Sequence, residues 1–205
     1  MAITHSNMAV RSPKASPGDP PPKYGHIHRT SADPVDYECD PFLRETRAYR
    51  RLQEHGLCKE GHVPDFYGSI ENIQQMTKGW EQHLKPLFKR PLPDSAKINA
   101  VLIEYVPNLG PFNMSAYSSQ RAEQLRTSMR KMHQAGVYHG DVHRRNLLVS
   151  KNTGRVLWIG FNASITFPLS NKTKSSDTEM QKLMKRVTQR LAQSLVELAE
   201  DRKLG

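Results

Sequence analysis

The chain has 205 residues, a formal net charge of +10 and a hydrophobic content of 37%, which is enough apolar material for a domain with a core. No apolar run approaches the ~18 residues that suggest a membrane span, and the first ten residues lack the core of a secretory signal. Cys39 and Cys58 are too few for a disulfide framework and lack zinc spacing. We expect an intracellular protein, cytoplasmic or nuclear, with reduced thiols and no membrane contact.

The positive charge is spread along the chain and is not gathered into a basic patch with interleaved aromatic residues. No DNA-reading motif stands out. We therefore assign the charge mainly to solvated surface, with some attraction for phosphate groups, and expect no nucleic-acid partner.

Two segments are predicted to lack regular structure. Residues 1–38 are rich in proline, serine and lysine, with three successive prolines at positions 20–22, and predict a disordered tail. Residues 77–97 contain three prolines and several lysines and predict a loop insertion. The domain is accordingly expected to occupy residues 39–205.

A helix is predicted over residues 41–55. Asp40 suits the N-cap, Pro41 suits the first helical position, and Gly56 suits the end. Helical spacing places Glu45 on the apolar side, where a charged group needs a partner. The other members of this face are Phe42, Tyr49 and Leu52.

Further elements follow in order along the chain. Residues 63–70 predict a turn leading into a strand, and Ala100–Val106 predicts a buried strand, followed by a turn or linker over 107–110. A helix is predicted over 119–135, ended by Gly136.

The last predicted helix spans residues 177–200 and has an apolar stripe with a basic row mostly opposite. A basic amphipathic helix can bind membranes or calmodulin-like partners, but packing of the stripe on the domain is the interpretation that we favour. The basic row consists of Lys182, Lys185, Arg186 and Arg190.

The most informative stretch is His-Gly-Asp-Val-His-Arg-Arg-Asn at residues 139–146, which follows the second predicted helix and precedes two short apolar runs at 147–149 and 156–159. An aspartate and an asparagine five positions apart on such a turn suit phosphoryl transfer. Asp141 can accept the proton of an attacking hydroxyl, and Asn146 can hold a metal ion that bridges the nucleotide phosphates.

The order of these features resembles the protein kinase-like superfamily over about residues 40–170. It is most similar to divergent kinase-like proteins of filamentous fungi, whose Pro-Phe-Leu-x-Glu-x-x-Ala-Tyr and Ile-Asp-Phe-Asn-Ala-Ser segments correspond to Pro41–Tyr49 and Ile159–Ser164. The loop is also similar to that of aminoglycoside and choline phosphotransferases. The resemblance implies an α+β, two-lobed fold with a truncated upper lobe (39–109) and a short, mainly helical lower lobe (110–205).

The resemblance implies roles for the polar residues of the loop. Asp141 would be the catalytic base, Asn146 would ligate magnesium, and His139 would brace the loop through hydrogen bonds. His143 would lie near the transferred phosphate. The residues alone leave other interpretations open: Asp141 can be kept for hydrogen bonds within its own loop, Asn146 can cap the loop, and His143 can be a polar loop residue.

The resemblance also implies a nucleotide site, with ATP and Mg²⁺ as cofactors of an active protein. Glu45 would pair with a lysine that grips the nucleotide phosphates, and the segment from Glu104 to Val106 would be the hinge that hydrogen-bonds adenine. Without such a lysine, an arginine or solvent is the more natural partner of Glu45.

The sequence departs from the kinase pattern in three places. Gly160 occupies the position of the metal-binding aspartate and has no ligand atom, so that Asp141 and Asn146 would hold only a weak, mostly hydrated ion. No glycine-rich phosphate loop precedes Glu45. Lys23, the lysine nearest the required place, follows three prolines, which do not suit a strand.

Two hypotheses follow. The first is a degenerate, pseudokinase-like domain that binds nucleotide weakly or not at all and acts through protein contacts, with a partner at the open edge of the upper lobe. The second is an active ATP-dependent phosphotransferase, acting on a protein Ser/Thr or on a small hydroxyl compound, with Asp141 as base. The loss of the carboxylate at Gly160 favours the first.

Overall fold

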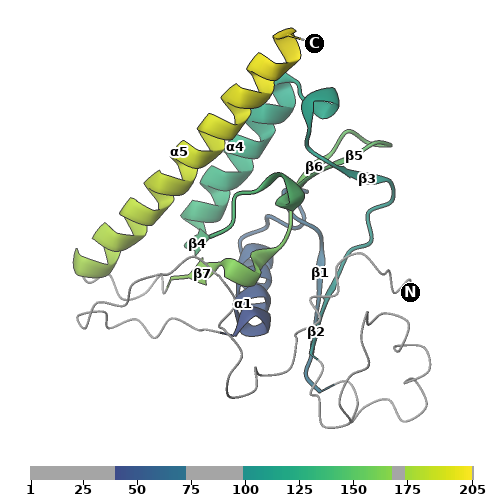
Figure 1. The fold of residues 1–205 in the computed structure, drawn as a ribbon. Helices are drawn as coiled ribbons and strands as arrows, with labels where there is room; N and C mark the ends of the chain where they lie inside the picture. Colours follow the sequence, from purple (N-terminus) through teal and green to yellow (C-terminus); the bar gives the residue numbers. More distant parts are fainter. Residues whose placement is uncertain (1–39, 73–98, 168–173, 205) are drawn as a thin grey trace, which may run out of the picture.

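A computed structural model describes residues 40–72, 99–167 and 174–204, except the side chains of 174–177, 179 and 202–204 (Figure 1). The predicted tail, the predicted loop insertion, Lys23 and Cys39 lie outside the described residues. The division into lobes at residue 109 stays a prediction.

The first helix, α1 (Pro41–Glu54), begins as predicted. The carboxylate of Asp40 accepts a hydrogen bond of 2.9 Å from the N–H of Phe42, and Pro41 stands in the first turn. The helix ends before Gly56, whose φ of +80° is one that glycine adopts without strain. The predicted apolar face, including Glu45, is buried.

Next to α1 lies an antiparallel two-stranded sheet of β1 (Phe66–Ile70) and β2 (Ala100–Ile103). The prediction that the second strand continues to residue 106 is wrong. The pairing ends where Glu104 donates its N–H to the carbonyl of Asp65 at 2.7 Å. Pro107 follows three residues later and has no N–H with which to continue a strand.

A three-stranded antiparallel sheet has the order β3 (Leu109–Pro111), β5 (Leu147–Ser150) and β6 (Val156–Trp158). Residues 109 and 110 were predicted as a turn or linker, and this prediction is wrong, since both lie in β3. A strand of three residues is too short to show the periodic pattern by which a strand is predicted. A second pair, β4 (Val137–Tyr138) and β7 (Ile165–Thr166), flanks the loop region. Short 3-10 helices lie between these strands: η2 (Met114–Ala116), η3 (Arg144–Asn146) and η4 (Phe161–Ala163).

Two long helices, α4 (Ser119–Gln134) and α5 (Lys174–Leu204), pack side by side (Figure 1). Gly136, with φ +74°, ends the first as predicted. The second is longer than the predicted span of 177–200, and its apolar stripe packs into the core, which confirms the favoured interpretation. The fully buried members of the stripe are Val187, Leu191, Leu195 and Leu198.

In the core, α1 packs both against β1 and against η4, which lie far apart in the sequence. Tyr49 of α1 stacks on Phe66 at 5.8 Å between ring centroids and meets Phe161 edge-on at 5.1 Å. Trp158 and Phe161 are fully buried. This contact fixes η4, and with it Gly160, against the buried face of α1. Among the helices that the structure describes, none combines the length and apolar character needed to cross a bilayer.

Candidate functional site

The loop 139–146 is held from its buried side by His139, as predicted. Its Nε2 lies 2.9 Å from the carbonyl oxygen of Ile159, and its Nδ1 lies 3.3 Å from the N–H of Asp141. Because a carbonyl only accepts and an N–H only donates, Nε2 carries the proton and Nδ1 accepts. Burial between Trp158 and Phe161 lowers the pKa of His139 to about 4, so the ring stays neutral at pH 7.

The exposed side of the loop carries the carboxylate of Asp141, which two neighbours engage. Nη2 of Arg145 lies 2.7 Å from Oδ2 of Asp141, an ion pair one helical turn apart in sequence. Nδ2 of Asn146 lies 2.9 Å from the same Oδ2 and 2.9 Å from the main-chain oxygen of Asp141. The structure thus brings Asp141 and Asn146 together, but it does so through direct hydrogen bonds.

Gly160 faces Asn146 across this arrangement. Its backbone is left-handed, with φ +75° and ψ +54°, and a Cβ atom there would lie 2.5 Å from Oδ1 and 3.0 Å from Cγ of Asn146. The Asn146 side chain therefore occupies the space into which a side chain at residue 160 would project. Residue 160 lies beside the loop, where the resemblance places the metal carboxylate.

Glu45 is buried on α1 and faces the start of η4. Its carboxylate accepts a hydrogen bond from the main-chain N–H of Phe161, while burial raises the pKa of Glu45 to about 7. No lysine or arginine pairs with Glu45 in the part of the chain that the structure describes. Burial, and to a lesser extent the nearby Glu45, raises the pKa of Tyr49, whose hydroxyl is buried without a hydrogen-bond partner among the described residues.

The predicted hinge is fastened by Arg155, which lies beyond the turn after β5. Nη1 of Arg155 contacts both carboxylate oxygens of Glu104, at 2.9 and 3.0 Å. Nε and Nη2 of the same guanidinium donate to the carbonyls of Gly61 and Val63, at 3.1 and 2.9 Å. The Glu104 side chain is thus engaged within the protein, and Val106 is buried. The backbone of the segment and the half-exposed side chain of Tyr105 are left to meet an adenine ring.

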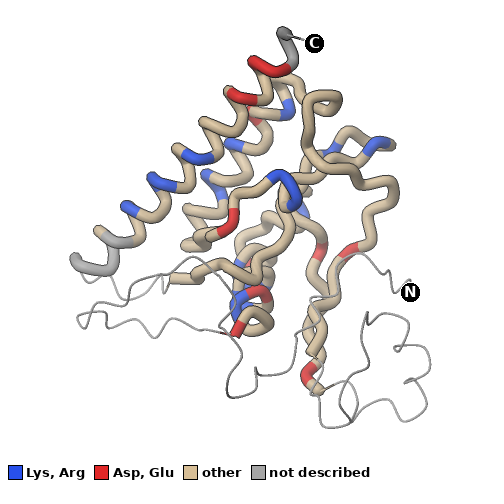
Figure 2. The backbone as a smooth tube through the Cα atoms, viewed as in Figure 1, with Lys and Arg blue, Asp and Glu red and all other residues tan. Residues whose placement is uncertain are grey.

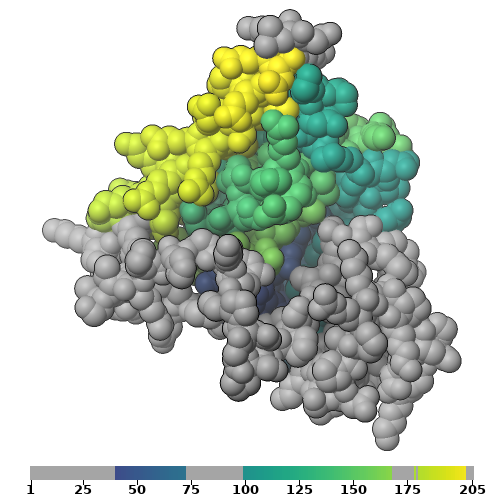
Figure 3. Space-filling model, viewed as in Figure 1, coloured from purple at the N-terminus to yellow at the C-terminus, as the bar shows by residue number. Residues whose placement is uncertain are grey.

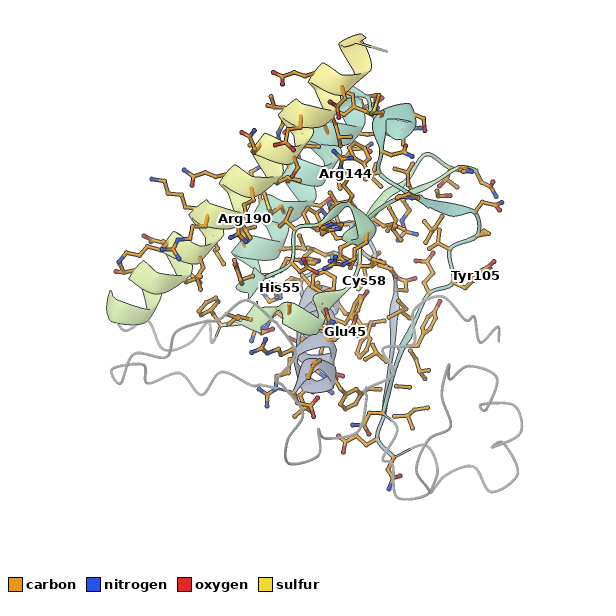
Figure 4. The ribbon with its side chains drawn as sticks, in the orientation of Figure 1. Glu45, His55, Cys58, Tyr105, Arg144 and Arg190 are labelled. Atoms are coloured by element: carbon orange, nitrogen blue, oxygen red, sulfur yellow. The ribbon has the colours of Figure 1, made fainter. Side chains whose placement is uncertain are left out.

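His143 is exposed, and its Nδ1 accepts the N–H of Arg145 at 3.2 Å, where it caps η3. Figure 4 labels Glu45 on α1 and Arg144 on the loop 139–146, two of the elements that contribute candidate site residues. Sequence reasoning missed Arg145, although its spacing of four residues from Asp141 was a usable signal. It also missed Arg155 and the N–H of Phe161, for which the sequence offers no signal because their partners lie far along the chain.

The side chains present do not fit a kinase metal centre. Magnesium requires near-octahedral oxygen ligands, yet Gly160 supplies none and Oδ2 of Asp141 is already engaged by two donors. Among the described residues, no group of three or more histidine, cysteine, aspartate or glutamate side chains is arranged to hold a metal ion.

Part of this chain is similar to a known protein family, and part of it aligns with a solved structure. The model of a lipopolysaccharide core biosynthesis family (WaaY) matches residues 87–185, which include the loop 139–146 and Gly160. Among solved structures, the Cydia pomonella granulovirus kinase PK-1 aligns at 12% identity and a TM-score of 0.40, over 65% of this chain and 41% of the viral chain. The aligned region thus spans less than half of that kinase. No curated protein matches the chain.

These observations define an α+β domain with a histidine-braced loop, a β5–β6 hairpin and a helix whose buried glutamate faces the residue after Gly160. Slightly less than half of the chain, residues 87–185, is similar to the lipopolysaccharide core biosynthesis family.

Proposed function

We propose that this chain is a pseudokinase-like domain that binds nucleotide weakly or not at all and acts through contacts with other proteins. The observation that carries the proposal is the pairing of Gly160 with Asn146. A residue without a ligand atom stands at the metal position, and the amide of Asn146 fills the adjacent space while donating to Asp141.

The state of the other site residues supports the same proposal. Asp141, the residue in the position of the base, is paired with Arg145 at 2.7 Å. Glu45 is satisfied by the N–H of Phe161 and has no cation beside it among the described residues. Phosphoryl transfer is catalysed almost wholly by positioning and charge neutralisation. Loss of a principal metal ligand and of the lysine costs on the order of 4 kcal/mol or more of transition-state stabilisation.

Thermal unfolding of the purified chain tests the proposal, with and without ATP and with and without Mg²⁺. A ligand that binds only the folded state stabilises it by RT ln(1 + [L]/Kd), which is about 2.7 kcal/mol at 100-fold saturation and about 5–10 °C in Tm for a chain of this length. We expect no shift, or a small shift that does not depend on Mg²⁺. The Asp141→Asn variant, which keeps the shape and removes the charge, is the matched control.

A large Mg²⁺-dependent shift that Asp141→Asn abolishes would overturn the proposal. It would favour the second candidate, an ATP-dependent phosphotransferase that uses Asp141 as base. The match to a lipopolysaccharide core biosynthesis family is the observation in favour of this candidate, and it would point to a carbohydrate hydroxyl as acceptor. Transfer of labelled phosphate to such an acceptor would then be the decisive assay.

A further inference from the structure

One exposed face of α5 carries two blocks of opposite charge. Four exposed cations lie in its middle part, and three exposed carboxylates follow near its end. At 3.6 residues per turn, the four cations and two of the carboxylates fall on the half of the helix opposite the buried Leu191, and Asp201 lies at the flank of that half. Figure 2 shows the cations as successive blue bands along α5 and the carboxylates in red towards the C-terminus. The cations are Lys182, Lys185, Arg186 and Arg190, and the carboxylates are Glu197, Glu200 and Asp201.

Within the described residues, Glu197 accepts a hydrogen bond from Gln193, and Arg190 and Arg186 lie near Tyr138. No carboxylate of the described residues pairs with the cations. On α4, by contrast, Arg126 and Arg130 pair with Glu123. None of the four α5 cations forms an ion pair with a described residue. Their spacing is unfavourable as well, because like charges four residues apart repel one another. The carboxylates lie towards the negative end of the helix dipole, where they destabilise the helix.

We propose that this charged face of α5 (residues 182–201) docks on the same face of a second copy of the chain, with the two helices antiparallel. A two-fold axis passing at Gln193 places each block of cations opposite a block of carboxylates. One pair lies at equal spacing on either side of the axis and a second falls within one residue of it, and symmetry makes each pair occur twice. The pairs are Arg186 with Glu200 and Arg190 with Glu197.

The pattern favours a second copy over other partners. An anionic membrane or a nucleic acid would attract the cations but would be repelled by the carboxylates on the same face. A partner with both signs in reverse order is required, and this chain itself supplies one. Figure 3 shows the outer side of α5 at the surface of the molecule. Gln193, at the proposed axis, is exposed and donates to Glu197 at 3.1 Å, so no apolar or bulky group obstructs the approach there.

The area that two α5 helices can bury determines how stable the proposed dimer should be. Twenty helical residues span ~30 Å, and the large apolar side chain that is clearly exposed on this part of α5 is Val196. A contact of two such helices is smaller and more polar than the interfaces of ~1,200–2,000 Å² that stable dimers use. The dimer should therefore be concentration-dependent and held by charge. Salt should dissociate it, because the Debye length falls from about 30 Å at 0.01 M to about 3 Å at 1 M.

Sedimentation velocity on the whole chain tests the inference, over a range of concentrations and at low and high ionic strength. One variant carries Arg186→Glu and Arg190→Glu, and a second carries Glu197→Lys and Glu200→Lys. Each variant alone should remain monomeric where the wild type dimerises, because like charges then face each other. An equimolar mixture of the two should recover a dimer, because the reversed charges are again complementary.

The matched control carries Arg50→Glu and Lys151→Glu, two exposed sites away from α5 with the same change in net charge. This control should dimerise like the wild type, and circular dichroism should show the same helix content in every variant. A wild type that stays monomeric at all concentrations, a dimer that persists at high salt, or a mixture that does not reassemble would each overturn the inference. None of these outcomes depends on nucleotide, so the test is independent of the proposed function.

Discussion

Replacement of Gly160 by aspartate would restore the missing metal carboxylate, yet the structure predicts that Gly160→Asp destabilises the fold. Residue 160 has φ +75°, where side chains other than glycine are strained. The new Cβ would also lie 2.5 Å from Oδ1 of Asn146, far inside van der Waals contact. The Asn146 amide must therefore turn away from the position in which it donates to Asp141.

The cost can be estimated from these contacts. Left-handed backbone costs about 1 kcal/mol for aspartate. Displacement of Asn146 gives up two hydrogen bonds, one of them to the partly exposed carboxylate of Asp141, worth together about 1–3 kcal/mol. The sum is about 2–4 kcal/mol, which corresponds to about 5–15 °C in Tm for a chain of this length.

Chemical denaturation in a double-mutant cycle is the assay. The Gly160→Asp change should cost about 2–4 kcal/mol in the wild type but only about 1 kcal/mol in the Asn146→Ala background, where the overlap is gone. Gly160→Ala, with the same Cβ and no carboxylate, should also be destabilising. Equal costs in both backgrounds, or a Gly160→Asp variant as stable as the wild type, would refute the geometry described for this pair.

Three further predictions concern other parts of the site. Arg155→Lys should lower stability by about 2–3 kcal/mol in urea unfolding, because one ammonium cannot serve both Glu104 and the two carbonyls that the guanidinium reaches; an unchanged midpoint would contradict this. Burial raises the pKa of Glu45 to about 7 from 4.5, so the folded state keeps a proton that the unfolded state releases. The contribution of Glu45 to stability should fall by about 3 kcal/mol as pH rises from 4.5 to 7, and the difference in unfolding free energy between the wild type and Glu45→Gln should show this slope. Burial lowers the pKa of His139 to about 4 from 6.5, so its contribution is lost as pH falls from 6.5 to 4, and unfolding of His139→Gln should be less sensitive to acid in that range.

Much of the fold could be predicted because its signals are local. Asp40 and Pro41 begin α1 through contacts within one turn, and Gly136 ends α4 because it supplies a positive φ. The apolar stripe of α5 repeats over many turns, so its period is unambiguous. The three-residue strand Leu109–Pro111 has no period to detect, and its partner Leu147–Ser150 lies far along the chain.

The proximity of the candidate site residues was predictable, their hydrogen bonding was less so, and their roles stay predictions. The motif at 139–146 located Asp141 and Asn146, and the brace by His139 follows from the same pattern. That Asn146 would fill the space beside Gly160 depends on how two separate turns pack. The clamp of Arg155 on Glu104 joins residues 51 positions apart, and no periodicity or spacing rule reports such a contact.

The brace of His139 has a consequence for how such a domain evolves. The ring fixes the loop from the interior, through Ile159 and the backbone of Asp141, whereas the groups that chemistry would need lie on the other side, towards solvent. Substitution on the outer side therefore leaves the inner support intact, so residues there can change one at a time while the domain stays folded. The conformation of the loop does not depend on whether its outer side carries out chemistry.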